Sequence, residues 1–355
     1  MKRRFVAVLV LVLLVAFSAV SFASGKGEGA AAATNKKITI GMIIPSMANE
    51  FWVRLSKFAQ KAADDLGFEL VVLDSRDSGD TQIKNAEDLI SRKVDGLIFV
   101  AYYDTGDRIL AMAEQAKIPT IVMDTKVEGV NPQEKYKQYI AYIGPSNHKA
   151  GYDIADFLAK HMKGKEMVAL YGTLGTSVAE ERREGMEDCL KSYPDIKLVG
   201  AQTGNFRRDD GMKVMEDFLV AHPDVSAVWC ANDEMALGAI NAIENAGKQA
   251  QVIVGGMDLN DEAVKAILDG RYSFSAGGHW LQGGFAATIM YDYLKGFAVP
   301  KDQSQVELVL AEVADKTTAV ALQQKWLPFP QWDFKAHSKA YSGKDAKAYT
   351  ELKIE

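Results

Sequence analysis

One segment near the start of the chain combines flat aromatic rings with polar side chains that can bind hydroxyl groups. Ser46, Asn49, Phe51 and Trp52 lie close together, directly after an apolar run that is typical of a buried strand. Aromatic faces pack against the C–H surface of a sugar ring, while an amide and a hydroxyl both donate and accept hydrogen bonds. The segment therefore predicts a site for a polyhydroxylated molecule. The alternative is that Phe51 and Trp52 simply fix the start of a helix.

Further polar side chains follow other expected strands at their carboxyl ends. Asp124 comes directly after residues 120–123, and an ionised carboxylate there can accept hydrogen bonds from two hydroxyl groups. In the second half of the chain the matching places hold Arg182, Phe206, Asn232 and Asp258. Three of these residues have a structural alternative, namely a helix cap or a turn for Asp124, a helix cap for Asn232 and an ion pair with neighbouring glutamates for Arg182. Their recurrence at successive strand ends favours a shared site.

The elements that would position these residues alternate between strand and helix. Short β-branched runs such as 38–44, 96–100 and 120–123 are separated by amphipathic stretches, and after residue 143 the order begins again. This pattern predicts an α/β protein with two Rossmann-like lobes, each a doubly wound parallel sheet covered by helices. In such sheets ligands bind at the carboxyl ends of strands, where helix N-termini present free N–H groups.

The N-terminus predicts export from the cytoplasm. Basic residues precede an apolar run from Phe5 to Val20, and small residues surround a cleavage point after Ala23. We expect a signal peptide over residues 1–23 and a disordered leader over residues 24–36. The apolar run is short of the roughly 20 residues that span a bilayer, and no cysteine near the cleavage point could carry a lipid. The predicted location is periplasmic or otherwise secreted.

Composition narrows the class further. About 320 residues remain after the leader, enough for two lobes. The 41 basic and 47 acidic residues give a net charge of −6, which provides no basic footprint for nucleic acid or an anionic membrane. Cys189 and Cys230 are the two cysteines, so a disulfide framework or a thiolate metal cluster is excluded. We expect two buried, unpaired thiols, and a single disulfide is the alternative.

Several motifs resemble those of type I periplasmic sugar-binding proteins of the ribose, galactose and allose-binding group, over nearly all of the expected mature chain. The matching segments are Asn49–Trp52, Ile118–Asp124, Gly175–Gly185, Ala221–Val225, Ala231–Gly238 and Val254–Asp258. The resemblance implies two lobes linked by three crossing strands, a sugar bound in the cleft with hinge closure, and recognition by the permease subunits of an ABC-type importer. On this basis we expect a first lobe over 37–144 plus 278–309, and a second over 145–277 plus 310–355 with the tail packed on it.

The resemblance also implies which residues contact ligand. Carried over by position, the contacts fall on Ser46, Asn49, Phe51, Trp52, Asp124, Arg182, Phe206, Asn232 and Asp258. The chain departs from the ribose-type pattern at Ala101-Tyr102-Tyr103, at Thr125, at Met257 and at Gly277-Gly278-His279-Trp280. Tyr102 and His279 therefore join the expected contacts. The departures favour a hydroxyl pattern other than that of ribose, within the hexose, pentose or inositol class, and a ligand larger than a pentose.

The sequence thus predicts a monomeric, non-enzymatic solute-binding component of a sugar importer, without cofactor or metal. One alternative is a receptor that presents its ligand for chemotaxis or autoinducer signalling. A more remote alternative is a glycoside-processing enzyme in which Asp124 and Asp258 act as acid and base. The nucleophile-elbow, metalloprotease, P-loop and dinucleotide-binding motifs do not occur in the sequence, nor does the spacing of a calcium loop.

Overall fold

The computed structural model describes residues 37–325 and 332–347 of the 355-residue chain. The predicted signal peptide over residues 1–23 and the predicted leader over residues 24–36 lie outside the described residues. So does most of the segment from Trp326 to Trp332. In the described ranges no helix is both long enough and apolar enough to cross a membrane.

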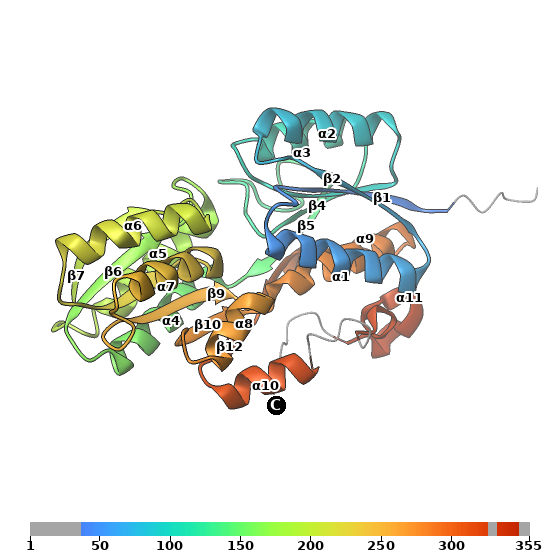
Figure 1. The fold of residues 1–355 in the computed structure, drawn as a ribbon. Helices are drawn as coiled ribbons and strands as arrows, with labels where there is room; N and C mark the ends of the chain where they lie inside the picture. Colours follow the sequence, from blue (N-terminus) through green and yellow to red (C-terminus); the bar gives the residue numbers. More distant parts are fainter. Residues whose placement is uncertain (1–36, 326–331, 348–355) are drawn as a thin grey trace, which may run out of the picture. The chain divides into compact units, whose positions relative to one another are not determined.

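The first lobe is a six-stranded parallel sheet in the order β11-β5-β4-β3-β1-β2 (Figure 1). Helices α1 and α9 cover one face, and α2 and α3 cover the other. Successive strand residues therefore enter different cores, since Ile98 packs with α1 and α9 while Phe99 packs with α2 and α3. The strands are β1 (Thr39–Ile44), β2 (Glu69–Asp74), β3 (Gly96–Val100), β4 (Thr120–Met123), β5 (Tyr139–Pro145) and β11 (Gln305–Leu308); the helices are α1 (Glu50–Leu66), α2 (Gly79–Ser91), α3 (Gly106–Ala116) and α9 (Gln282–Leu294).

The second lobe repeats the plan with the strand order β12-β10-β9-β8-β6-β7. Helix α4 packs against α5, and α6 packs against α7. The strands are β6 (Glu166–Tyr171), β7 (Lys197–Thr203), β8 (Val225–Cys230), β9 (Ile253–Asp258), β10 (Phe274–Gly277) and β12 (Ala311–Val313); the helices are α4 (Asn147–His161), α5 (Ser177–Leu190), α6 (Arg208–Ala221), α7 (Asp233–Asn245), α8 (Asp261–Leu268) and α10 (Lys316–Lys325). The predicted class, two α/β lobes with parallel sheets, is confirmed, although β12 pairs antiparallel with β10 at the sheet edge.

Three segments carry the chain from one sheet to the other. These crossings lie between β5 and α4, between β10 and α9, and between β11 and β12. The second crossing contains the short 3-10 helix η1 (His279–Leu281), so a predicted site residue lies on a connection between the lobes. The carboxyl ends of β1, β3 and β4 in one sheet, and of β6, β7, β8 and β9 in the other, carry the remaining predicted site residues.

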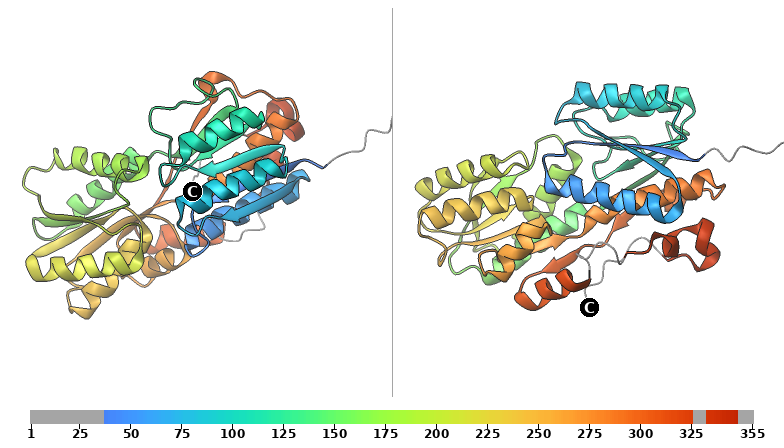
Figure 2. Two further views of the ribbon diagram at one scale, coloured as in Figure 1. Left: turned by 90° about the horizontal axis from the view of Figure 1, so that it is seen from above. Right: turned by 45° about the vertical axis from the view of Figure 1, so that its right-hand side comes forward.

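The described part of the C-terminal tail, residues 332–347, packs on the first lobe beside α1 and α9 (Figure 2). Phe334 is fully buried there. Asp292 of α9 accepts hydrogen bonds from the Ser338 hydroxyl (2.5 Å) and from the first main-chain N–H of α11 (Lys339–Ser342, 2.6 Å). The prediction that the tail packs on the second lobe is wrong for these residues, because the buried carboxylate on α9 binds the start of α11.

The two cysteines are buried and unpaired, which confirms the prediction. Cys189 lies in α5 and Cys230 ends β8. Burial raises the pKa of the Cys189 thiol to about 12 and raises the pKa of Cys230 well above its ordinary value. Both thiols are therefore protonated at neutral pH and pack as small apolar side chains.

Candidate functional site

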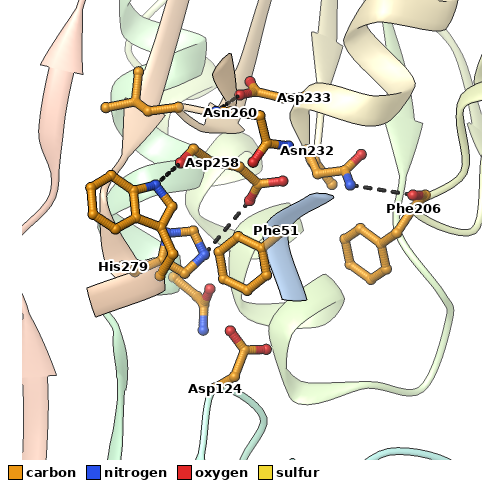
Figure 3. Close-up of polar contacts among 12 residues, drawn as sticks. Phe51, Asp124, Phe206, Asn232, Asp233, Asp258, Asn260 and His279 are labelled. Atoms are coloured by element: carbon orange, nitrogen blue, oxygen red, sulfur yellow. Dashed lines mark hydrogen bonds and ion pairs between the residues drawn. The ribbon is translucent and has the colours of Figure 1, made fainter. Parts of the chain in front are cut away.

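Residues from both lobes line one small cavity at the carboxyl ends of the strands, which we call the inner cavity (Figure 3). Its lining consists of Asn49, Phe51, Trp52, Tyr102, Asp124, Val178, Arg182, Phe206, Asn232, Asp258 and His279. The sequence predicts all of these as site residues except Val178. The inner cavity offers about 30 Å³ to the centres of water molecules, which is room for roughly two or three waters.

Helix α1 places two aromatic rings at the inner cavity. Asn49 caps this helix, because its Oδ1 accepts a hydrogen bond from the Phe51 main-chain N–H (2.9 Å) and so fixes the first turn. The rings of Phe51 and Trp52 are 4.8 Å apart and nearly perpendicular, at 84°. Phe51 also lies 4.5 Å from the His279 imidazole. Both rings belong to the core of the first lobe and also line the inner cavity. Each ring can therefore fix the start of α1 and also present a face to the cavity.

Asp124 follows β4 and is 3% exposed, with a positive φ of 65°. Its Oδ1 accepts a hydrogen bond from Nε2 of Gln282 (3.0 Å), and its Oδ2 accepts one from the Thr125 hydroxyl (3.2 Å). The Tyr142 hydroxyl donates to its main-chain carbonyl (2.7 Å). Burial raises the pKa of the Asp124 carboxyl, while the positive charge of Arg182 and the two side-chain hydrogen bonds oppose that rise.

Asp258 at the end of β9 is also buried, but its carboxylate is less well satisfied. Its Oδ1 lies 3.6 Å from Nε2 of His279, and among the described residues the carboxylate accepts no hydrogen bond. Its main-chain carbonyl accepts a hydrogen bond from the Trp280 indole (3.1 Å) (Figure 3). Burial and then the charge of Asp233 raise the pKa of Asp258 well above its ordinary range, against the opposing effect of Arg182. The φ of 137° is costly for an L-residue, so the surrounding structure imposes it.

A buried network behind Asp258 holds its loop in place. Asp233, the first residue of α7, accepts hydrogen bonds from the hydroxyls of Tyr272 (2.8 Å) and Ser275 (2.7 Å) and from the main-chain N–H of Asn260 (3.1 Å). Burial raises the pKa of Asp233 to about 6. The network ties α7 to β10 and to the loop that follows Asp258.

Arg182 lies in α5 and is 3% exposed. Its Nε donates to Oδ1 of Asn147 (2.9 Å), and its Nη1 donates to the carbonyl of Ala231 (2.6 Å). Its guanidinium carbon lies 5.8 Å from the centre of the Phe206 ring. Helix α4 approaches closely at Gly151, where a Cβ atom would stand 1.9 Å from the Arg182 carbonyl oxygen. The alternative of a solvated ion pair on α5 is therefore wrong, because the guanidinium is buried and fixed toward the inner cavity.

Asn232 combines capping with a place in the cavity wall. Its Oδ1 accepts a hydrogen bond from the Met235 main-chain N–H (3.0 Å), which caps α7. Its Nδ2 donates to the main-chain carbonyl of Phe206 (3.3 Å) (Figure 3). Phe206 has a φ of 59°, and this turn brings its ring to the inner cavity. The two alternatives for Asn232, a helix cap and a site residue, are therefore compatible, because one conformation of the side chain does both.

The structure places one predicted residue elsewhere and adds others that the sequence did not indicate. Ser46 is buried, but its hydroxyl accepts a hydrogen bond from the Ala48 main-chain N–H (3.3 Å), and it does not line the inner cavity. Val178 was not predicted, because an apolar residue at helical spacing indicates core. Gln282 and Asn147 were not predicted either, since each acts through a contact with a residue distant in sequence.

The inner cavity suits a neutral, hydroxyl-rich ligand. Asp124 and Asp258 supply acceptors, Arg182 supplies a donor, and the aromatic rings supply flat apolar surface. Burial and the neighbouring guanidinium lower the pKa of His279 well below its ordinary value, so the imidazole is neutral. With two carboxyl groups and one guanidinium in its lining, the inner cavity disfavours a ligand that carries a negative charge. In the described part of the chain no group of three or more His, Cys, Asp or Glu residues could hold a metal ion.

Comparison with known proteins identifies relatives of this chain. The family model described as periplasmic binding protein domain matches residues 40–297. The ribose import binding protein of Salmonella typhimurium is 38% identical over 237 residues, which covers 66% of this chain and 77% of that protein. Among solved structures, the binding protein of the arabinose ABC transporter from Shewanella sp. ANA-3, bound to L-arabinofuranose, superposes with a TM-score of 0.74 at 27% identity, covering 83% of this chain and 98% of that one. A solute-binding protein from Bacillus halodurans with bound myo-inositol gives a TM-score of 0.72 at 26% identity, covering 82% and 98%.

Proposed function

This chain belongs to the periplasmic binding protein domain family, and on that premise we propose that it is the solute-binding component of an ABC-type sugar importer. Its ligand is a monosaccharide or related polyol of the hexose, pentose or inositol class. One observation carries the proposal: carboxylates, a guanidinium, amides and aromatic rings from both lobes converge on one cavity. Related proteins described as binding ribose, arabinofuranose and myo-inositol support the same ligand class.

Each side chain has a role in this proposal that follows from its chemistry. The rings of Phe51, Trp52 and Phe206 pack against the C–H faces of the sugar. Asp124 and Asp258 accept hydrogen bonds from hydroxyl groups, and charge-assisted bonds of this kind are the strong ones. Arg182, Asn232 and Asn49 donate, while neutral His279 and Tyr102 offer one donor or acceptor each. No covalent step is needed.

Binding requires the two lobes to separate and close again. The inner cavity has room for roughly two or three waters, far less than a sugar ring needs. Direct contacts join the lobes around it: Arg54 of α1 pairs with Asp261 of α8, Glu50 accepts a hydrogen bond from the Asp261 main-chain N–H (3.1 Å), and Lys126 pairs with Glu181 of α5 (2.8 Å). A ligand that touches both lobes shifts the equilibrium toward the closed state by its differential affinity.

The family and the predicted signal peptide together favour a periplasmic or otherwise extracytoplasmic location. The partners in this proposal are the sugar and the permease subunits in the membrane, and we expect the protein to act as a monomer. We expect no nucleic-acid partner, since the net charge is −6.

The proposal is tested by thermal unfolding of the mature protein with D-ribose, D-allose, D-galactose, L-arabinose, D-fructose and myo-inositol. A compound bound only by the folded state raises the melting temperature, by an amount that grows with its concentration over its Kd. We expect at least one compound to do so, and we expect the shift at the same concentration to be much smaller in Asp258→Asn. The matched control is Asp224→Asn, an exposed aspartate of the same lobe. A flat response to all six compounds would refute the proposal.

A further inference from the structure

A second and larger cavity adjoins the inner cavity. It is lined by the loops that follow β3, β4 and β6 and by the first two turns of α5, and it offers about 790 Å³ to the centres of water molecules, against about 30 Å³ in the inner cavity. We call it the outer cavity. It lies between loops of the two lobes, as the inner cavity does, but none of the sugar contacts proposed above requires a space of that size.

The two cavities share a thin wall. Tyr102 lines both of them. Asp124 lines the inner cavity and the next residue, Thr125, lines the outer one, with the Thr125 hydroxyl donating to the Asp124 carboxylate (3.2 Å). On α5, Val178 and Arg182 line the inner cavity, and the residues immediately before them, Ser177 and Glu181, line the outer cavity. A ligand bound at Asp124 is therefore within one side chain's width of the outer cavity.

Aromatic rings continue from one cavity into the other. The Trp52 and Tyr102 ring centres are 6.1 Å apart, and those of Tyr102 and Tyr103 are 5.5 Å apart. Tyr103 is 36% exposed, and its hydroxyl donates to Asp77 (3.1 Å), which fixes the ring at the outer cavity. The Tyr102 hydroxyl makes no hydrogen bond among the described residues, so it is free to bind a ligand at the junction of the two cavities. Such a series of rings suits successive sugar units.

The charges around the outer cavity restrict what can occupy it. The lining carboxylates are Asp104, Asp107, Glu128, Glu180, Glu181 and Glu184, and the one lining cation is Lys126. Lys126 is already paired with Glu181 (2.8 Å), and cations outside the lining pair with Glu180 (Arg183, 2.7 Å) and with Asp107 (Lys135, 2.7 Å). The other three carboxylates have no ion pair among the described residues, so the cavity keeps a negative charge. A uronate or phosphate would be repelled here, whereas hydroxyl groups can donate to these carboxylates.

We propose that the outer cavity is a second sugar site, which takes an uncharged glycosyl unit linked to the sugar in the inner cavity. The ligand is then a neutral disaccharide or glycoside, recognised at its first unit by the buried residues and at its second by Tyr102, Tyr103 and the carboxylates of α5. This inference rests on the proposed function, because it needs a sugar in the inner cavity to anchor the second unit.

Calorimetric titration of the mature protein with matched compounds tests the inference. The sets are D-galactose and D-glucose with lactose and melibiose, D-fructose and D-glucose with sucrose, L-arabinose with arabinobiose, and myo-inositol and D-galactose with galactinol. We expect at least one two-unit compound to bind about tenfold more tightly than the better of its components, as a stacked ring and one or two hydrogen bonds would provide. If every two-unit compound binds no more tightly than its components, the outer cavity is not a sugar site.

Two variants locate the effect. Tyr103→Ala removes the ring, and Leu174→Trp fills the outer cavity from an exposed position that does not support the core. Both should lower the affinity for the two-unit compound to that of its component while leaving the component's affinity unchanged. Tyr341→Ala, at an exposed tyrosine of the tail outside both cavities, is the control. Unchanged affinity for the two-unit compound in both variants would overturn the inference, whereas an absence of binding by any single sugar would overturn the proposed function itself.

Discussion

The two buried aspartates of the inner cavity come from opposite lobes and differ in how well the protein itself satisfies them. Asp124 of the first lobe accepts hydrogen bonds from Gln282 and Thr125. Asp258 of the second lobe has no hydrogen bond to its carboxylate among the described residues and has only the His279 ring nitrogen at 3.6 Å. A carboxylate that is desolvated and unsatisfied gains more from a ligand that supplies donors. We therefore expect affinity to depend more on the carboxylate of the second lobe, Asp258, than on Asp124.

Asp258→Asn is expected to have the largest effect on binding. It removes the charge that strengthens each hydrogen bond from the ligand, and we expect a loss of about a hundredfold in affinity, or roughly 3 kcal/mol. The ligand-free protein should not become less stable, because burial and Asp233 disfavour the ionised form of Asp258. Calorimetric titration and thermal unfolding of the same sample separate the two effects. A variant that keeps its affinity but melts earlier would make Asp258 a structural residue.

Asp124→Asn should cost less, about tenfold in affinity. The protein can adapt to the amide, because the unpartnered Oε1 of buried Gln282 can turn to accept a hydrogen bond from the new N–H group. The same titration, run beside Asp258→Asn, gives the ratio of the two losses. If the loss in Asp258→Asn were no larger than the loss in Asp124→Asn, the second lobe would not hold the more important carboxylate.

Sequence features at the ends of expected strands predicted most residues of the inner cavity. The polar residues that were missed act through contacts with residues distant in the sequence. Asn49 and Asn232 were found because each follows an expected strand, and the carboxyl ends of parallel strands are where ligands bind; the structure shows that both also cap the next helix. Gln282 was not found, because its role depends on meeting Asp124 from a position 158 residues away. The tail was assigned to the wrong lobe for the same reason: nothing near Ser338 in the sequence indicates Asp292 as its partner.

The stability of the second lobe should depend on pH through Asp233. Burial raises the pKa of this carboxyl to about 6 in the folded protein, against about 3.9 in the unfolded chain. The unfolded state therefore binds fewer protons between pH 4 and pH 6, so the folded state gains stability as the pH falls through that window. Relative to Asp233→Asn, the melting temperature of the wild type should rise by about 3 °C between pH 7 and pH 5. If the melting temperatures of the two proteins change with pH in the same way across this range, Asp233 does not titrate there.

The pH dependence of affinity provides the finest comparison of the two lobes. His279 faces Asp258, Arg182 and Phe51, and burial with the charge of Arg182 lowers the pKa of His279 well below its ordinary value. The imidazole therefore stays neutral between pH 6 and pH 8, and the affinity profiles of the wild type and His279→Gln should run parallel to within about twofold. Any slope in that range then belongs to the carboxyls. A slope that comes from Asp258, whose pKa is the more strongly raised of the two, should persist in Asp124→Asn and flatten in Asp258→Asn. If the slope disappears in His279→Gln instead, the titrating group is His279, on the segment that connects the two lobes.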